Sequence, residues 1–349
     1  MNTTLKVAYF GTPEFSAQFL EKILQDDKLP VDISLVVTQP DKNVGRKKDP
    51  QPSAVKQIAV KNNIPVFNSP FSTLKSQIEE LDLALIYFYG EILPKELLDL
   101  PKYGFWNIHF SLLPQYRGTS PATFSLVMGD QETGVSLVLT DEKLDHGPLI
   151  AQKKVLIEPH ETRIDLETRL HNIAYEMFVE NIEKILSDTE GYNPRGYNTE
   201  GWKTEGWKSR LNSQDHLRST YTRFPTRNDG YIPLGILQDA FEGKNTKFVP
   251  KIVQDYCKKN KLMIPQRNLQ KTLFDLYRGL YPWPGIWTEL EIKGVKKRLK
   301  ILEIDPENFE ISNFKFQIQT VQLEGKTPVA FSQFNKAYSV FQIPNIKSR

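Results

Sequence analysis

Asn107 and His109 are a pair of residues whose types and spacing suggest chemistry. They stand two positions apart at the end of the apolar run 105–109, which predicts a β-strand. Alternate side chains of a strand share one face, so both should point the same way. Ligands of open α/β sheets bind beyond the carboxyl ends of the strands. The pair is therefore placed where a substrate would bind, although an Asn-x-His pair alone is weak evidence and is also compatible with a structural role.

Asp145 adds a carboxylate in a loop after another predicted strand, also at a carboxyl end. An amide, an imidazole and a carboxylate suit acyl transfer to an amine. Asn107 can donate a hydrogen bond to the oxyanion of a tetrahedral intermediate, while His109 can take the amine proton or, when protonated, stabilise the oxyanion. Asp145 can orient His109 and hold a water that carries a proton. Because no Ser or Cys stands where a covalent nucleophile would be needed, the pattern favours direct transfer.

The first half of the chain alternates apolar runs with helical periodicity. Strands are predicted over residues 5–10, 33–38, 65–67, 83–89, 105–109 and, half-exposed, 133–140. Helices are predicted over residues 13–26, 52–62, 121–128 and 162–187. Strands that alternate with helices predict an α/β, Rossmann-like fold, in which a mostly parallel sheet carries helices on both faces.

The second half shows a different pattern of predicted elements. Its short strand-like pieces, at 299–304, 314–323 and 338–341, lie between turns, and a basic helical stretch precedes them near 236–278. Many short strands predict a small β-barrel of the OB-like kind, with the helical stretch either as an insertion or as the helix that plugs one end of the barrel. We therefore expect a catalytic domain over residues 1–190, a linker over 191–212 that contains a doubled Thr-Glu-Gly-Trp-Lys block, and an OB-like domain over 213–349.

Composition narrows the class of protein. The 349 residues suit about two domains. Residues 1–212 hold 23 Lys and Arg against 29 Asp and Glu, a net −6, whereas residues 213–349 hold 22 against 13, a net +9. A basic back half favours a partner with phosphates, although an uneven solvated surface would look the same. The single cysteine, Cys257, and the lack of any long apolar run predict a cytoplasmic protein with no metal and no membrane span.

The motifs around Asn107 resemble the core of the 10-formyltetrahydrofolate-dependent formyltransferases. Asn-Ile-His-Phe-Ser-Leu-Leu-Pro at 107–114 is followed by Tyr-Arg-Gly at 116–118 and Leu-Asp-His-Gly at 144–147. The resemblance implies that Asn107, His109 and Asp145 are the catalytic trio. It also implies a folate site whose residues are Ser111, Leu112, Leu113 and Pro114 together with Phe88, Tyr89, Gly90 and Ile92 at a neighbouring strand end.

Further matches point to the methionyl-tRNA formyltransferases within that family. Phe-Gly-Thr-Pro-Glu-Phe at 10–15 and Tyr-Pro-Trp-Pro at 281–284 are similar to segments of these enzymes. The resemblance implies formyl transfer from 10-formyltetrahydrofolate to the amino group of initiator methionyl-tRNA, and we expect a monomer. It places Phe15 near the methionyl side chain, although Phe15 fits equally well as a core residue of the first helix.

A basic loop over residues 41–56 resembles the signature loop of the same enzymes. Gly45 gives its backbone freedom, and a mobile basic loop beside the crevice can enter the end of an RNA acceptor stem and bind phosphates. The resemblance assigns this contact to Arg46, and the charge of the loop adds Lys42, Lys47 and Lys48. The alternative is a solvated lysine loop.

Some features depart from the family pattern, and other functions compete. Phe110 replaces a small residue and should pack into the core. His146 replaces Thr and is expected to face solvent, with a second titrating group beside Asp145 as the alternative.

A formyltransferase for a nucleotide-linked amino sugar would share the trio but usually lacks the Gly-Arg-Lys-Lys loop. A glycinamide ribonucleotide formyltransferase normally has a single domain. An RNA-binding module without turnover is the non-enzymatic alternative, and the intact trio argues against it.

Replacing Arg46 by Ala should weaken the use of methionyl-tRNA, because one phosphate contact is lost. The salt dependence of tRNA binding should flatten, with a log–log slope smaller by about 1. Binding across a salt series measures this, with Lys75→Ala outside the loop as the control. An unchanged slope and rate would mean that the loop is only solvated surface.

Overall fold

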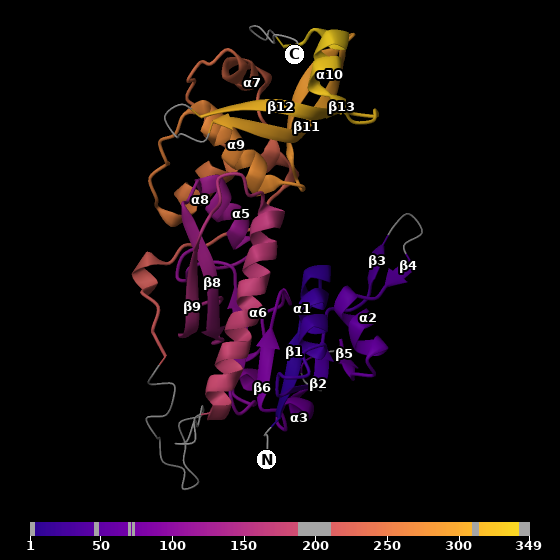
Figure 1. Cartoon of the computed structure of the whole chain (residues 1–349), viewed down its shortest axis with the longest axis vertical. Coiled ribbons are helices and arrows are strands. Elements are labelled where there is room, and N and C mark those ends of the chain that lie inside the picture. The colour runs from indigo at the N-terminus through magenta and orange to yellow at the C-terminus, as the bar shows by residue number, and fades with distance from the viewer. Residues whose placement is uncertain are drawn as a thin grey trace. The chain divides into compact units, whose positions relative to one another are not determined.

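The computed structural model describes residues 4–44, 49–68, 71, 74–187, 211–308 and 314–341 (Figure 1). Packing divides the chain into two compact units. The first holds residues 1–117, 134–154 and 170–219, and the second holds 118–133, 155–169 and 220–349. Each unit combines segments that are far apart in the sequence. The predicted domains are instead two continuous stretches, 1–190 and 213–349, joined by one linker. The predicted domains stay a prediction, and most of the predicted linker lies outside the described residues.

Within the described residues, the first unit is built on a seven-stranded sheet with the order β5-β2-β1-β6-β7-β8-β9. Its strands are β1 (Leu5–Phe10), β2 (Val31–Val37), β5 (Val66–Phe67), β6 (Leu83–Ile86), β7 (Phe105–His109), β8 (Glu132–Leu139) and β9 (Leu149–Leu156). From β5 to β7 neighbouring strands are parallel, and β8 is antiparallel to β7. The predicted mostly parallel, Rossmann-like sheet is confirmed. Its strand order reverses between β1 and β6, which is the usual position of a ligand crevice.

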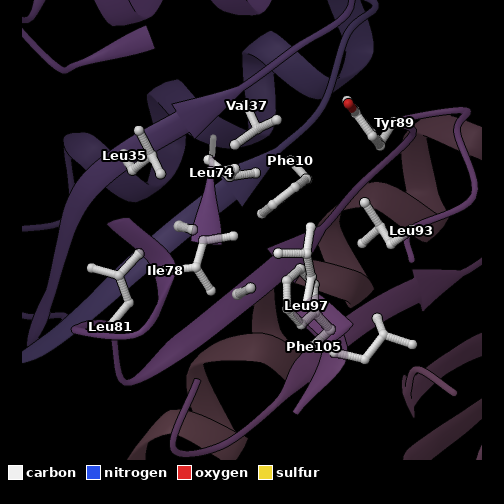
Figure 2. Close-up of a cluster of buried hydrophobic side chains, with 13 residues drawn as sticks. Phe10, Leu35, Val37, Leu74, Ile78, Leu81, Tyr89, Leu93, Leu97 and Phe105 are labelled. Carbon is white, nitrogen blue, oxygen red and sulfur yellow. The ribbon is translucent and has the colours of Figure 1, made fainter. Parts of the chain in front are cut away.

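Helices cover both faces of this sheet. On one face, Phe19 of α1 (Glu14–Leu24) packs 4.4 Å from Tyr87 and 6.2 Å from Phe178 of α6 (Arg163–Ser187), between ring centroids. Helix α2 (Ala54–Lys61) packs against α1. The other face carries α3 (Lys75–Ile78) and α4 (Lys95–Leu98), whose leucines and isoleucine close over Phe10 and Phe105 (Figure 2). Three layers therefore enclose a core on each side of the sheet.

Several local predictions need correction. Strand β6 ends at Ile86 rather than at residue 89, because Phe88 has a left-handed φ of 54°. Strand β8 is buried beyond Glu132 and not half-exposed. Its polar residue Ser136 is satisfied inside, since the hydroxyl donates to Ser111 O and accepts from Leu113 N.

The structure also contains strands that the sequence did not predict. In the first unit these are β9 and the short antiparallel hairpin of β3 (Lys42–Val44) and β4 (Asp49–Gln51). In the second unit they are the strands over 286–292 and 329–330.

The second unit combines helices with an antiparallel sheet. The helices are α5 (Pro121–Met128), α7 (Leu234–Phe241), α8 (Lys251–Asn260), α9 (Leu269–Leu280) and α10 (Phe331–Tyr338). Among the described residues the sheet has the four strands β10 (Ile286–Ile292), β11 (Val295–Asn308), β12 (Lys315–Leu323) and β13 (Val329–Ala330) in that order. The predicted helical stretch is confirmed. The strand predicted at 338–341 is wrong, because Tyr338 is the last residue of α10 and Ser339 caps that helix with a left-handed φ of 49°.

None of the helices in the described part of the chain has both the length and the apolar character needed to span a membrane.

A buried group of charges anchors α9 in the second unit. Asp275 is fully buried and contacts three cations: Lys271, Arg267 at 2.5 Å and Arg278 at 2.9 Å. Burial lowers the pKa of Lys271, although Asp275 opposes that shift. Because the cations outnumber the carboxylate, each of them depends on Asp275.

Replacing Asp275 by Asn should destabilise the protein by about 3–5 kcal/mol, because the buried Arg278 and the largely buried Lys271 and Arg267 lose their counter-charge. Denaturant unfolding measures this. Asp255→Asn is the matched control, since the Asp255 side chain is 41% exposed. It pairs with the exposed Lys251 at 3.0 Å and with Arg223 at 3.3 Å, which keeps Asp229 as a second carboxylate. These exposed contacts should contribute about 1 kcal/mol or less. Equal losses in the two variants would contradict the dependence on Asp275.

Candidate active site

The three predicted catalytic side chains meet at the carboxyl end of β7. The amide Nδ2 of Asn107 donates to Asp145 Oδ1 at 3.0 Å, and His109 Nδ1 lies 3.7 Å from Asp145 Oδ2. The side chains of His109 and Asp145 are only 7% and 8% exposed. The Asp145 carboxylate thus lies between an amide donor and an imidazole, in buried surroundings that strengthen electrostatic interactions.

Asp145 reaches this site by a path that differs from the expected one. Strand β8 is antiparallel to β7, with His109 opposite Ser136, so the carboxyl end of β8 lies at the amino end of β7. The expectation that Asp145 follows a strand end at the same edge is therefore wrong. The loop between β8 and β9 turns back instead: Asp145 has a φ of 48°, and a Cβ on Gly147 would lie 1.8 Å from Leu139 O. The loop, and not the polarity of the strand, delivers the carboxylate.

The contacts of His109 define which ring nitrogen can work as a base. Its Nε2 lies 2.9 Å from the carbonyl oxygen of Tyr116. A carbonyl oxygen only accepts, so Nε2 carries a hydrogen and donates it. In the neutral ring, Nδ1 then holds the lone pair and faces Asp145. Tyr116 itself has a left-handed φ of 59°, which orients this carbonyl.

The residues predicted to border the folate after β6 divide into two groups. Ile92 and Phe88 are 78% and 40% exposed, and Gly90 is exposed too, so they can meet a ligand. The Tyr89 side chain is instead buried in the core of Figure 2, with its ring 5.4 Å from that of Phe10. Burial raises the pKa of its hydroxyl. The side chain of Tyr89 therefore has a packing role.

The turn at 111–114, which is predicted to border the folate, is held by a hydrogen bond and by buried side chains. The hydroxyl of buried Ser111 donates to Gln115 O at 2.6 Å, and Leu113 is buried as well. Leu112 and Pro114 are half-buried. Leu112 and Pro114 are thus the more accessible members of the turn, whereas Ser111 and Leu113 shape it.

Phe15 belongs to an aromatic cluster on the α1 face. Its ring lies 4.6 Å from His171, 5.8 Å from Phe88 and 6.2 Å from Phe110. Phe110 is 2% exposed, which confirms that it packs into the core. Burial lowers the pKa of His171 to about 4, so the ring is neutral near pH 7. Phe15 itself is half-buried, and its place in a methionyl pocket stays a prediction.

Of the predicted phosphate contacts, Lys42 is exposed and donates from Nζ to Gln39 Oε1 at 2.7 Å. Arg46, Lys47 and Lys48 lie outside the described residues. No group of three or more His, Cys, Asp and Glu side chains suited to a metal ion occurs among the residues with described positions.

The predicted site did not include three polar residues near the trio, which are Arg117, Gln214 and His216. Arg117 is 1% exposed and donates from Nη2 to Gln214 Oε1 at 2.6 Å and to His216 Nδ1 at 2.7 Å. Gln214 donates from Nε2 to the carbonyl oxygens of Asp145 at 3.0 Å and Gly147 at 2.7 Å. Gln214 follows Asp145 by 69 residues, so no local pattern could have joined them. Arg117 was marked only by the Tyr-Arg-Gly motif.

His146 was expected to face solvent, and that expectation is wrong. Its Nδ1 lies 2.6 Å from Asp141 Oδ2, and its side chain is 25% exposed. Its ring stacks on His216 with centroids 3.9 Å apart and planes within 5°. His146 therefore joins the loop of Asp145 to the segment that carries Gln214.

Known formyltransferases resemble this chain over most of its length. The family model described as formyl transferase matches residues 5–182. The chain is 28% identical over 354 residues to the methionyl-tRNA formyltransferase of Geotalea uraniireducens, covering 96% of each chain. It is 37% identical over 185 residues to that of Prochlorococcus marinus, a match that spans 54% of the relative. An N-formyltransferase structure from Helicobacter canadensis, in complex with folinic acid and dTDP-3-aminofucose, is 20% identical with a TM-score of 0.51, covering 90% of this chain and 98% of that one, which shows the fold alone.

Replacing His109 by Ala should lower the rate of formyl transfer at least ~100-fold, because the acid–base group is lost. Steady-state and single-turnover rates measure this. The affinity for tRNA should change little. His160→Ala, an exposed histidine outside the trio, is the control. Turnover like that of the unmodified protein would refute the role of His109.

Proposed function

The chain belongs to the formyl transferase family, and on this basis we propose that it transfers the formyl group of 10-formyltetrahydrofolate to the α-amino group of initiator methionyl-tRNA. The product is N-formylmethionyl-tRNA, which serves translation initiation. The observation that carries the proposal is the contact of Asn107, His109 and Asp145 at the end of β7. The Geotalea relative, which bears the name methionyl-tRNA formyltransferase, matches nearly the whole chain and supports this acceptor.

The trio suits a direct transfer. The neutral amine attacks the formyl carbon, a C–N bond forms, and the carbonyl oxygen becomes an oxyanion. The Asn107 amide has two hydrogens; one binds Asp145, and the other can bind the oxyanion. His109 Nδ1 takes the proton that the amine loses, and Asp145 stabilises the imidazolium. The proton then passes to N10 of the folate as the C–N10 bond breaks, which releases tetrahydrofolate.

The folate is proposed to lie between two segments of the first unit. One is the turn at 111–114, and the other contains Phe88, Gly90 and Ile92. The exposure of Phe88 and Ile92 supports this position, because large apolar side chains at the surface often mark ligand sites. Phe15 is proposed to contact the methionyl side chain. The donor is a co-substrate, and the proposed reaction uses no metal.

The charge of the chain supports tRNA as a partner. Arg46, Lys42, Lys47 and Lys48 are proposed to contact acceptor-stem phosphates. The region 213–349, with its net +9, is proposed as the tRNA-binding domain, and its four-stranded sheet as part of an OB-like barrel. Strand β11 carries two exposed lysines, Lys296 and Lys300, that suit phosphate contacts. The enzyme is proposed to act as a cytoplasmic monomer.

A labelled-donor assay should show formyl transfer to methionyl-tRNA and not to nucleotide-linked amino sugars. The acceptor amine must be neutral and unblocked to attack, so uncharged tRNA and N-acetylmethionyl-tRNA should stay unlabelled. Thin-layer or filter-binding analysis of the product measures this. Labelling of an amino sugar in place of methionyl-tRNA would overturn the proposed acceptor while keeping the reaction class.

A further inference from the structure

We propose that Gln214 is a positioning residue, which holds the left-handed turn that presents Asp145 to His109. Arg117 in turn fixes the orientation of the Gln214 amide. The effect on catalysis rests on the proposed function, whereas the contact itself can be tested without the reaction.

The orientation of the Gln214 amide follows from its partners. Its Oε1 accepts from Arg117 Nε at 3.2 Å and Nη2 at 2.6 Å, and its Nε2 donates to two carbonyl oxygens. A flipped amide would place its NH2 group against a guanidinium that can only donate. It would also place its oxygen against carbonyl oxygens that can only accept. Gln214 therefore has one stable orientation, and all of its principal hydrogen-bonding capacity is used.

The two carbonyls that Gln214 binds belong to the strained residue of the loop and to the glycine two positions after it. Asp145 has a φ of 48°, a region that costs free energy for a residue with a side chain. Its carbonyl and that of Gly147 receive both hydrogens of the Gln214 amide, at 3.0 and 2.7 Å. Gly147 is buried, so loss of this donor would leave a polar oxygen poorly satisfied. The two hydrogen bonds offset the cost of the turn and fix the position of the carboxylate.

The segment that carries Gln214 is itself fastened to the first unit. Asn212 forms a backbone bridge with Leu149, at the start of β9. His216 accepts from Arg117 through Nδ1 and stacks on His146. The segment therefore cannot shift without disturbing the Asp145 loop. A chain cut at residue 212 would lose Gln214, and this truncation would change the catalytic loop as well as the basic region.

The test compares two variants in the full-length protein. Gln214→Met keeps the length of the side chain and removes all of its hydrogen bonds. Gln214→Glu keeps an acceptor for Arg117 but cannot donate when ionised. Gln77→Met, at an exposed glutamine of α3, is the control. The readouts are kcat and KM for formyl transfer, folinic acid binding, and hydrogen exchange of the peptide spanning residues 141–148.

Both Gln214 variants should lower kcat about tenfold to a hundredfold, as expected when a catalytic group moves by about 1 Å. KM for the folate and folinic acid binding should change little, and exchange of the 141–148 peptide should accelerate. A Gln214→Glu variant with normal kcat would overturn the proposal, because support of Arg117 alone would then suffice. If the unmodified protein forms no formylmethionyl-tRNA, the proposed function fails. Hydrogen exchange then decides the positioning role alone, and unchanged exchange rejects it.

Discussion

The hydrogen bond between Asn107 and Asp145 is the interaction on which the site depends, since it joins a strand of the sheet to the loop that carries the carboxylate. Asn107 is placed by β7, and its position follows from the register of the parallel strands. Asp145 must be carried back from the opposite edge, because β8 is antiparallel. A bond of 3.0 Å therefore requires the whole loop to hold one conformation.

That conformation costs free energy, which the surrounding structure offsets. Phe88, Tyr116 and Asp145 are all non-glycine residues with left-handed φ values, and each belongs to or borders the site. Such backbone persists only where neighbouring contacts hold it. Tyr116 directs a carbonyl to His109, and Asp145 directs a carboxylate to the same ring. The backbone strain at Tyr116 and Asp145 thus lies where the direction of a carbonyl or a carboxylate toward His109 matters.

Buried polar side chains supply these contacts. Ser136 joins β8 to the turn at 111–114, and Gln214 joins the Asp145 loop to Arg117. The second unit uses the same principle at Asp275, where one carboxylate holds three cations on and near α9. In each case removal of one partner leaves others buried without compensation, so the polar contacts specify the packing.

The sequence by itself determined the class of fold, because apolar runs that alternate with helical periodicity allow few arrangements. It also predicted the proposed catalytic trio, since Asn107 and His109 share a strand and their motif is distinctive; the three side chains do meet in the structure. It could not place β9 or α10, or show that β8 is buried on both faces, because these depend on which neighbour each segment meets.

Only the tertiary structure decided how Asp145 reaches His109 and which residue holds it there. Strand polarity is a property of pairing, and pairing of β7 with β8 reversed the expected direction. Gln214 contacts the loop across 69 residues, so no local pattern contains that information. Residue types can state what chemistry is available, but the position of a carboxylate within 4 Å of an imidazole depends on long-range contacts.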